Sequence, residues 1–188
     1  MSISTRIVLK SNVKRGNLSK EAARRGWVIA RVGTTGEDHI EDIWKVDGSD
    51  TYLHYIEDPV AQCSYLISQG SDKESLDAQA RQIFPHHTLD SALALFHRAP
   101  ERDSKISTIY LVALCSPPDP EDPVIEAFRI ATRDPDPDVR SSAAIATGYL
   151  GWSELRQILS MMRESDASPD VRMNARLIME GMDSTQNN

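Results

Sequence analysis

The chain has 188 residues, of which 40% are hydrophobic and 26% are charged, and its formal net charge is −7. This length is sufficient to bury a sizeable core, in one domain or in two small ones. No apolar run is long enough to cross a bilayer, and residues 1–10 lack the apolar segment of a secretory signal peptide. We therefore expect a globular cytoplasmic protein that makes no membrane contact.

The charge is distributed unevenly along the chain. Residues 1–35 hold eight basic residues and one acidic residue, whereas the rest of the chain holds 13 basic and 27 acidic residues. A basic segment ahead of an acidic body is compatible with ion pairs inside the protein, with binding of a partner, or with contact to nucleic acid. Ion pairs inside the protein are favoured, because the basic segment also carries apolar runs typical of strands.

Residues 1–70 have the pattern of a small sheet with helical additions. Runs rich in β-branched and aromatic residues predict strands at 7–9, 27–32, 43–46, 51–56 and 63–67. Ser19 as N-cap and Gly26 as terminator delimit a short helix between the first two strands. Asp47 and Gly48, between two strand-like runs, are typical of a hairpin turn. The sequence therefore predicts a small, basic α/β domain with a β-hairpin.

From Ser71 the pattern changes to amphipathic helices. Ser71 and Glu74 form a capping box ahead of a helix that Pro85 stops, and a second predicted helix ends at Pro100. An apolar run at 106–114 aligns loosely with a helical repeat that follows it in the chain. The acidic, proline-rich stretch between the two is predicted to be an exposed loop.

A short repeat organises the C-terminal part of the chain. Pro-Asp-Val-Arg occurs at 137–140 and again 32 residues later, at 169–172, and each copy is preceded by an apolar run that predicts a partner helix. After each copy, apolar residues place one stripe along a helix. The stripes comprise Val139, Ala143, Ala146 and Leu150 in the first copy, and Val171, Ala175, Ile178 and Met182 in the second. A fixed period of this size indicates stacked antiparallel helical pairs.

These repeats resemble the HEAT repeat. The resemblance rests on Asp134 and Asp166, each five residues before the valine of Val-Arg, on the arginine itself, and on a second helix rich in small residues. It implies a right-handed helical solenoid in which aspartates and arginines of adjacent repeats form a hydrogen-bonded ladder. The ladder residues would be Asp134, Arg140, Asp166 and Arg172. The second copy carries Arg176 and Glu180 where the first has small residues, which predicts a terminal cap with a polar outer face.

The predicted fold class is α+β. A small N-terminal domain of sheet and helix is expected at 1–70, HEAT-like helical repeats at 71–183, and a loose polar tail at 184–188. This architecture makes the repeats the part of the chain most suited to binding, since stacked repeats present an extended surface.

The sequence carries no recognised catalytic motif. It contains no GxSxG, P-loop, GxGxxG, HExxH or paired-cysteine motif. Cys63 and Cys115 are predicted to be free thiols, with a disulfide or metal ligation as the alternatives left open. The adjacent His86 and His87 cannot share a helix face as metal ligands do, so we assign them to a surface loop. No catalytic residue, cofactor site or metal site is therefore predicted.

We expect a non-catalytic scaffold or adaptor that binds another protein. Side chains pointing away from the apolar stripes would line the concave surface formed by the second helix of each pair. The predicted partner-binding residues are Ser142, Ile145, Tyr149, Asn174 and Leu177. The acidic body of the chain favours a partner with a basic or amphipathic surface.

Two other functions stay open. Some HEAT-like proteins act on the tetrapyrrole (bilin) chromophores of phycobiliproteins as lyase or chaperone subunits, and only the resemblance supports this alternative. Nucleic-acid contact would have to come from residues 1–35. The HEAT-like DNA glycosylases bind DNA through a basic concave face, whereas residues 120–182 carry seven basic and eleven acidic residues, the wrong sign for phosphate.

Overall fold

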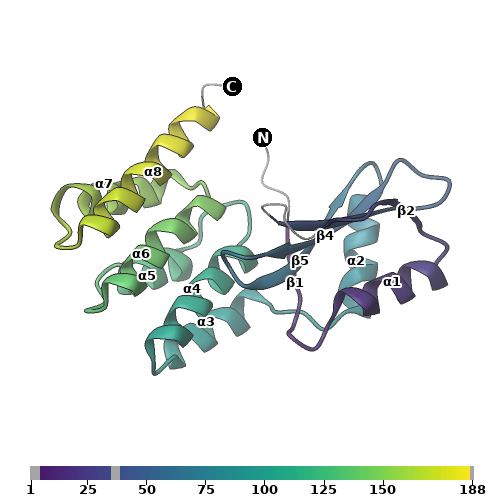
Figure 1. Ribbon diagram of the computed structural model, residues 1–188, viewed down its shortest axis with the longest axis horizontal. Coiled ribbons are helices and arrows are strands. Elements are labelled where there is room, and N and C mark those ends of the chain that lie inside the picture. The colour runs from purple at the N-terminus through teal and green to yellow at the C-terminus, as the bar shows by residue number, and fades with distance from the viewer. Residues whose placement is uncertain (1–4, 35–38, 187–188) are drawn as a thin grey trace. The chain divides into compact units, whose positions relative to one another are not determined.

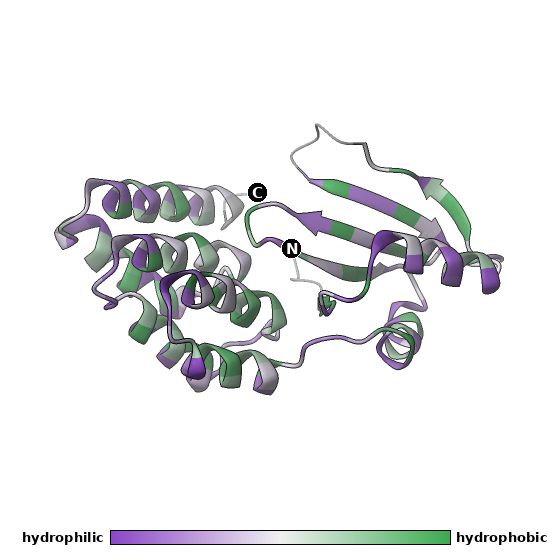
Figure 2. Cartoon of the chain, turned by 60° about the horizontal axis from the view of Figure 1, so that its bottom comes forward, coloured by the Kyte–Doolittle hydropathy of each residue, from purple (hydrophilic) through white to green (hydrophobic). Residues whose placement is uncertain are grey.

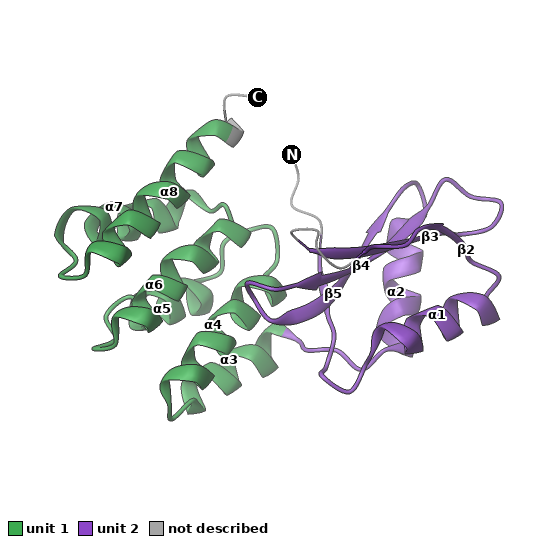
Figure 3. Cartoon of the chain, in the orientation of Figure 1, with its two compact units in different colours: residues 1, 89–188 green, residues 2–88 purple. Residues whose placement is uncertain are grey.

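The computed structural model describes residues 5–34 and 39–186 (Figure 1). Within these residues it contains a five-stranded antiparallel sheet and eight α-helices, so the chain belongs to the α+β class. The chain divides into two compact units, one within residues 2–88 and one within residues 89–188 (Figure 3). We call them the sheet unit and the helical unit.

The sheet unit is built on strands in the order β1-β5-β4-β3-β2, each antiparallel to its neighbours. The strands are β1 (Ile7–Val8), β2 (Val28–Arg31), β3 (Ile40–Lys45), β4 (Tyr52–Asp58) and β5 (Cys63–Gln69). β3 and β4 form a hairpin at the position where the sequence predicts one. Gly48 has a φ of 70° in its turn, a backbone conformation that glycine adopts without steric cost.

Two helices, α1 (Arg15–Arg24) and α2 (Lys73–Ile83), contribute to the core of the sheet unit. Leu18 and Ala22 of α1 are buried together with Leu76 and Ala80 of α2 and with apolar residues of the sheet. The sequence places the start of the helical repeats at Ser71, whereas α2 packs with the sheet. An amphipathic pattern shows that a helix buries one face, but it does not say which neighbour covers that face.

The helical unit consists of three consecutive helical pairs. They are α3 (Leu89–Arg98) with α4 (Arg102–Cys115), α5 (Asp122–Ala131) with α6 (Pro137–Ala146), and α7 (Arg156–Ser165) with α8 (Pro169–Gln186). α6 packs against both α4 and α8, so these three helices form one layer of the unit. Figure 2 shows hydrophobic and hydrophilic residues alternating along the helices, as amphipathic helices require.

The apolar stripes predicted on α6 and α8 lie in the core of the helical unit. Seven of the eight stripe residues are buried, and Ile178 is half-buried. Ala143 and Ala175 are completely buried at 0% exposure, where their small side chains allow close helix approach. Burying a valine or leucine contributes about 1.5–3 kcal/mol, so the stripes are a main source of stability for the two pairs.

The connection between α6 and α7 runs through two short 3₁₀ turns, Thr147–Tyr149 and Ser153–Leu155. Between them, the Nε1 of Trp152 donates a 2.9 Å hydrogen bond to the carbonyl of Pro118, which fixes the proline-rich loop onto the helical unit. The loose tail expected from residue 184 is instead helical as far as Gln186, and residues 187–188 lie outside the described chain. Among the described helices, none combines the length and apolar character needed to cross a membrane.

Candidate interaction surface

The loops and helix starts of the helical unit are joined by a chain of ion pairs. Arg140, near the start of α6, makes two parallel hydrogen bonds to the carboxylate of Asp166, from Nε at 2.8 Å and from Nη2 at 2.9 Å. In the preceding pair, Lys105 of α4 donates a 2.7 Å hydrogen bond to the carboxylate of Asp134. Each cation thus binds the aspartate of the next helical pair. We call Lys105, Asp134, Arg140, Asp166 and Arg172 the ladder.

Each ladder aspartate also holds its own loop in shape. Asp134 Oδ1 accepts a hydrogen bond from the amide of Asp136, and Asp166 Oδ1 accepts one from the amide of Ser168, both at 2.9 Å. Such aspartate turns lead directly into α6 and α8, whose first residues are prolines suited to a helix start. The repeated Asp and Pro of the sequence therefore have a local structural cause.

The two ladder arginines are oriented in the same way. Nη1 of Arg140 donates to the carbonyls of Asp134 and Pro135, at 2.8 and 3.1 Å. Nη1 of Arg172 donates to the equivalent carbonyls, those of Asp166 and Ala167, at 2.5 and 3.2 Å. In the described part of the chain no carboxylate is bonded to Arg172, which stands at the last pair. The four ladder residues named from the sequence thus lie in one connected series.

Lys105 is the ladder residue that the sequence did not single out. Lys105 lies 29 residues before Asp134, whereas Arg140 lies 26 residues before Asp166. The two cation-to-aspartate intervals therefore differ, and the repeat does not point to Lys105. Lysine also replaces the arginine of the motif, which removes the two-pronged contact. A basic residue at the start of the predicted helix at 106–114 is the signal that could have identified it.

The ladder changes the pKa of its charged members. The hydrogen bond from Arg140 lowers the pKa of Asp166 against the opposing effect of burial. Burial raises the pKa of Asp134, but hydrogen bonds from Lys105 and from the Asp136 amide outweigh it, so this pKa is also lowered. The bond to Asp166 raises the pKa of Arg140. Both carboxylates are therefore charged at neutral pH, as strong charge-assisted hydrogen bonds require.

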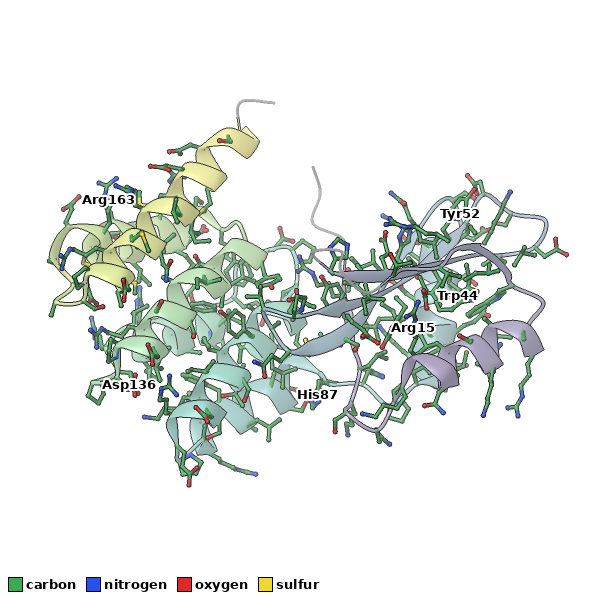
Figure 4. All side chains as sticks on the ribbon, in the orientation of Figure 1. Arg15, Trp44, Tyr52, His87, Asp136 and Arg163 are labelled. Atoms are coloured by element: carbon green, nitrogen blue, oxygen red, sulfur yellow. The ribbon has the colours of Figure 1, made fainter. Side chains whose placement is uncertain are left out.

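The acidic residues at the start of α6 are held by cations and by the backbone. Asp136 caps α6 by accepting a 2.8 Å hydrogen bond from the amide of Asp138 (Figure 4). Arg102 of α4 pairs with Asp138, and its Nε lies 3.5 Å from Oδ2 of Asp136. Within the described residues no cluster of histidine, cysteine, aspartate and glutamate is arranged to hold a metal ion. The ion pairs of Arg102 join α4 to the start of α6.

Five residues of α6, of the turn after it and of α8 are predicted to bind a partner, and the structure gives them different surroundings. Tyr149 packs edge-on against Tyr110 of α4, with ring centroids 6.2 Å apart. Asn174 donates a 2.6 Å hydrogen bond to Ser141 of α6. Both residues thus connect neighbouring helices of the layer, which limits their availability to a partner.

The remaining predicted residues differ in accessibility. Ser142 and Ile145 are half-buried, whereas Leu177 of α8 is 51% exposed. Met173, one helical turn before Leu177, is 46% exposed and was not predicted. Residues four apart share a helix face, so Met173 and Leu177 form one exposed apolar patch on α8. We call these two residues the α8 patch.

Charged residues border the α8 patch. Arg176 and Glu180 form an exposed ion pair on α8 with a nitrogen–oxygen distance of 3.8 Å, and Asp170 lies exposed in the first turn. Arg156 of α7 pairs with Asp183 further along α8. An apolar centre with a charged rim is the usual arrangement of a protein-binding surface.

The basic N-terminal segment makes ion pairs within the sheet unit. Arg15 binds Asp42, and Arg31 binds Glu41 at 2.9 Å. At the C-terminal end of α1, Arg24 and Arg25 both pair with Glu21. These contacts support the first of the three roles considered for the segment, since four of its cations already have carboxylate neighbours.

Comparisons with protein-family models, with curated proteins and with solved structures gave no match for this chain. The function is therefore inferred from the geometry of the chain itself.

Proposed function

We propose that the helical unit is a HEAT-like repeat module that serves as a non-catalytic scaffold for binding another protein. The observation that carries this proposal is the α8 patch, an exposed apolar pair on a layer of helices that the ladder holds in register. Met173 and Leu177 are 46% and 51% exposed, although burial of such side chains is favourable. A partner that covers them gains this free energy without the need to rearrange the layer.

The chemistry of the surroundings indicates the kind of partner. Residues 120–182 carry an excess of acidic residues, which attracts a basic or amphipathic surface. An amphipathic helix of the partner can place its apolar face on the α8 patch and its basic residues against Asp170 and Glu180. Docking of a partner helix in this way suits a patch whose two residues lie one helical turn apart.

The other two functions receive no comparable support. Nucleic acid would have to compete with the carboxylates that already neutralise Arg15, Arg24, Arg25 and Arg31. Chromophore binding rests on the resemblance alone. Both alternatives give distinct signals, namely visible absorbance of the purified complex or binding that weakens steeply with salt.

The test compares two variants of the tagged full-length chain. One carries Met173→Glu and Leu177→Glu in the α8 patch, and the control carries Met161→Glu on α7, a residue of similar exposure at 52%. Proteins retained from native lysate are quantified by mass spectrometry for both variants and the wild type. We expect specific proteins to be lost with the patch variant and kept with the control. Equal retention by all three proteins would refute the α8 patch as the binding surface.

A further inference from the structure

The last arginine of the ladder is oriented like the one before it but has a different set of bonds. Nη1 of Arg140 donates to two loop carbonyls, while its Nε and Nη2 hold the carboxylate of Asp166. Nη1 of Arg172 makes the corresponding bonds, to the carbonyls of Asp166 and Ala167. Within residues 5–34 and 39–186, Nε and Nη2 of Arg172 are bonded to no carboxylate. We call these two nitrogens the Arg172 fork.

The Arg172 fork is suited to a carboxylate. A guanidinium is planar and rigid, so bonds that fix Nη1 also fix the direction of the other two nitrogens. Two parallel N–H donors match the two oxygens of a carboxylate, and such charge-assisted bonds are strong. Arg172 is also half-buried, and a charge that is partly removed from water is stabilised when it is paired and hydrogen-bonded. A carboxylate therefore finds donors that are already in position.

The side of α6 that faces the next pair is defined by its contacts with α8. Nδ2 of Asn174 donates a 2.6 Å hydrogen bond to Oγ of Ser141. Further along, Cδ1 of Ile178 lies 3.4 Å from the position that a Cβ on Gly148 would take. Both contacts advance in the same direction along the two helices, so α8 runs parallel to α6. Ile145, one turn after Ser141, is half-buried on this side.

The α8 patch lies on the corresponding side of α8. The period of 32 residues relates Ser141 to Met173 and Ile145 to Leu177. On α6 these positions are half-buried, whereas on α8 they are 46% and 51% exposed. Figure 3 shows the pair of α7 and α8 at one end of the stacked pairs. Met173 follows Arg172 directly, so the α8 patch and the Arg172 fork adjoin at this end of the stack.

The geometry of the ladder indicates what kind of segment fits this end. Asp166, which binds Arg140, lies three residues before Pro169, the first residue of α8. α8 then packs along α6. A segment that binds the Arg172 fork in the same way is a helix with a carboxylate in the turn before its start. Apolar residues one turn apart on that helix would cover the α8 patch.

A second copy of the chain stacked head to tail would not supply this carboxylate. Such a copy would present its first helical pair to α8. Lys105 and Arg140 hold equivalent places in the ladder and lie 35 residues apart, so the residue of the first pair that corresponds to Asp134 is Ala99. Alanine cannot bind the Arg172 fork. The fork therefore favours a different protein over another copy of this chain.

We propose that the partner bound at the α8 patch completes the ladder with a carboxylate of its own. An aspartate or glutamate in the turn before a partner helix binds Nε and Nη2 of Arg172, and the apolar face of that helix covers Met173 and Leu177. The partner helix runs parallel to α8, as α8 does to α6. This inference rests on the proposed scaffold function, and it adds the chemical group that the partner must carry and the direction in which its helix lies.

The first test uses a displayed library of peptides, each designed as a helix with a randomised turn before it. The full-length chain is the bait, and peptides that also bind the variant with Met173→Glu and Leu177→Glu are removed. We expect the turns of the survivors to favour aspartate and glutamate over asparagine and serine, which start helices equally well but carry no charge. Survivors without this preference would overturn the proposal and leave the α8 patch as a binding surface. A library that leaves no survivors would contradict both.

The second test measures whether the two charges meet. A selected peptide and its amide form, in which the acidic residue of the turn is replaced by the corresponding amide, are labelled for fluorescence anisotropy. The amide form should bind the wild type about tenfold more weakly than the acidic form does. Arg172→Gln should weaken binding of the acidic form by a similar factor and leave binding of the amide form unchanged. Losses that multiply when the two changes are combined would overturn the proposal.

Two further variants of the chain sharpen this measurement. Arg172→Lys should recover only part of the affinity, because lysine cannot make two parallel hydrogen bonds. Arg129→Gln removes the same charge from an exposed arginine of α5 and should bind the acidic form as the wild type does. Equal weakening by Arg129→Gln and Arg172→Gln would reduce the effect to net charge and contradict a contact at the Arg172 fork.

Misfolding and self-association are checked separately. Arg172→Gln also loses the bonds to two carbonyls, so circular dichroism and urea denaturation compare it with the wild type. The amide form of the peptide tests the same contact on the unchanged chain, and equal affinity of the two forms would overturn the proposal whatever the stability of the variant. Analytical ultracentrifugation without peptide should show no dimer that Met173→Glu and Leu177→Glu abolish, because such a dimer would mean that a second copy covers the α8 patch.

Discussion

Each unit of the protein contains an arginine–aspartate pair with two parallel hydrogen bonds, and the two pairs differ in how the chain brings them together. Arg140 and Asp166 belong to a repeat, and the same local turn precedes α6 and α8. Arg15 and Asp42 join the start of α1 to the middle of β3 without any periodic pattern. The first pair is visible in the sequence, and the second becomes visible only when the sheet is built.

The comparison also shows two ways in which ion pairs hold secondary-structure elements in position. In the helical unit, charge pairs run from one helical pair to the next and keep the helices in register. In the sheet unit, a single pair joins α1 to β3 beside a groove that both residues line, with Asp42 buried and Arg15 partly exposed. The loss of either pair should therefore weaken its own unit, with effects that differ in size because the two arginines keep different partners.

The largest effect is expected for Asp42→Ala, which should lower the free energy of unfolding by about 3–4 kcal/mol. The change leaves the Gly33 amide without its acceptor and leaves Arg15 with only the Gly33 carbonyl. Urea denaturation of the full chain measures the effect. Asp42→Asn should cost less, because its amide oxygen can still accept from Gly33. A loss below 1 kcal/mol for the alanine variant would contradict the assigned role.

Asp166→Ala should cost less, about 2–3 kcal/mol, because Arg140 keeps its bonds to two backbone carbonyls. The lost interactions are the two bonds from Arg140 and the one from the Ser168 amide. Hydrogen exchange should show the loss of protection in α6 and α8 and not in the sheet. Asp170→Ala, which removes an exposed acid from the same helix start, is the control and should cost less than 1 kcal/mol.

Lys105→Ala should have a smaller effect, about 1 kcal/mol, since one hydrogen bond to Asp134 is lost and the lysine side chain is 32% exposed. Thermal unfolding monitored by circular dichroism can resolve this change. Lys105→Arg should be at least as stable as the wild type if the arginine makes two parallel hydrogen bonds to Asp134, as Arg140 does to Asp166. Failure of arginine to support stability at this position would show that Lys105 is not equivalent to the ladder arginines.

The smallest effect is expected in the acid dependence of stability. The pKa values of Asp134 and Asp166 are lowered in the folded chain, so their contribution is present above the unfolded value of about 3.9 and is lost as the pH falls through the lowered folded pKa. Asp166→Asn should therefore lose less stability than the wild type between about pH 5 and pH 2. Parallel curves for the two proteins in urea titrations would argue against a lowered pKa at this site.

The sequence predicts the α+β class because strand-like and helix-like patterns are separated along the chain. It also predicts where α6 and α8 lie along the chain, since their apolar stripes and the prolines at their starts are local features. The assignment of α2 to the sheet could not be obtained in this way, because Leu76 and Ala80 would look the same against any apolar neighbour. Long-range packing decides that question.

The predicted partner-binding residues also divide into what a local pattern predicts and what long-range packing decides. Leu177 was predicted from its position off the stripe, and it is exposed. Tyr149 and Asn174 were predicted by the same rule but contact Tyr110 and Ser141 of neighbouring helices. A helix in a layer has neighbours on both sides, so only part of its non-stripe surface is accessible. The period of one helix cannot reveal where those neighbours lie.

The scaffold proposal is tested most directly by photo-crosslinking in native lysate. A photoreactive amino acid is placed at Leu177 in the α8 patch, and in a matched protein at Gln157, which is exposed on α7. The account predicts that a specific protein is crosslinked from position 177 and not from position 157. Identical crosslinked products from both positions, or none from position 177, would contradict the claim that the α8 patch is the partner-binding surface.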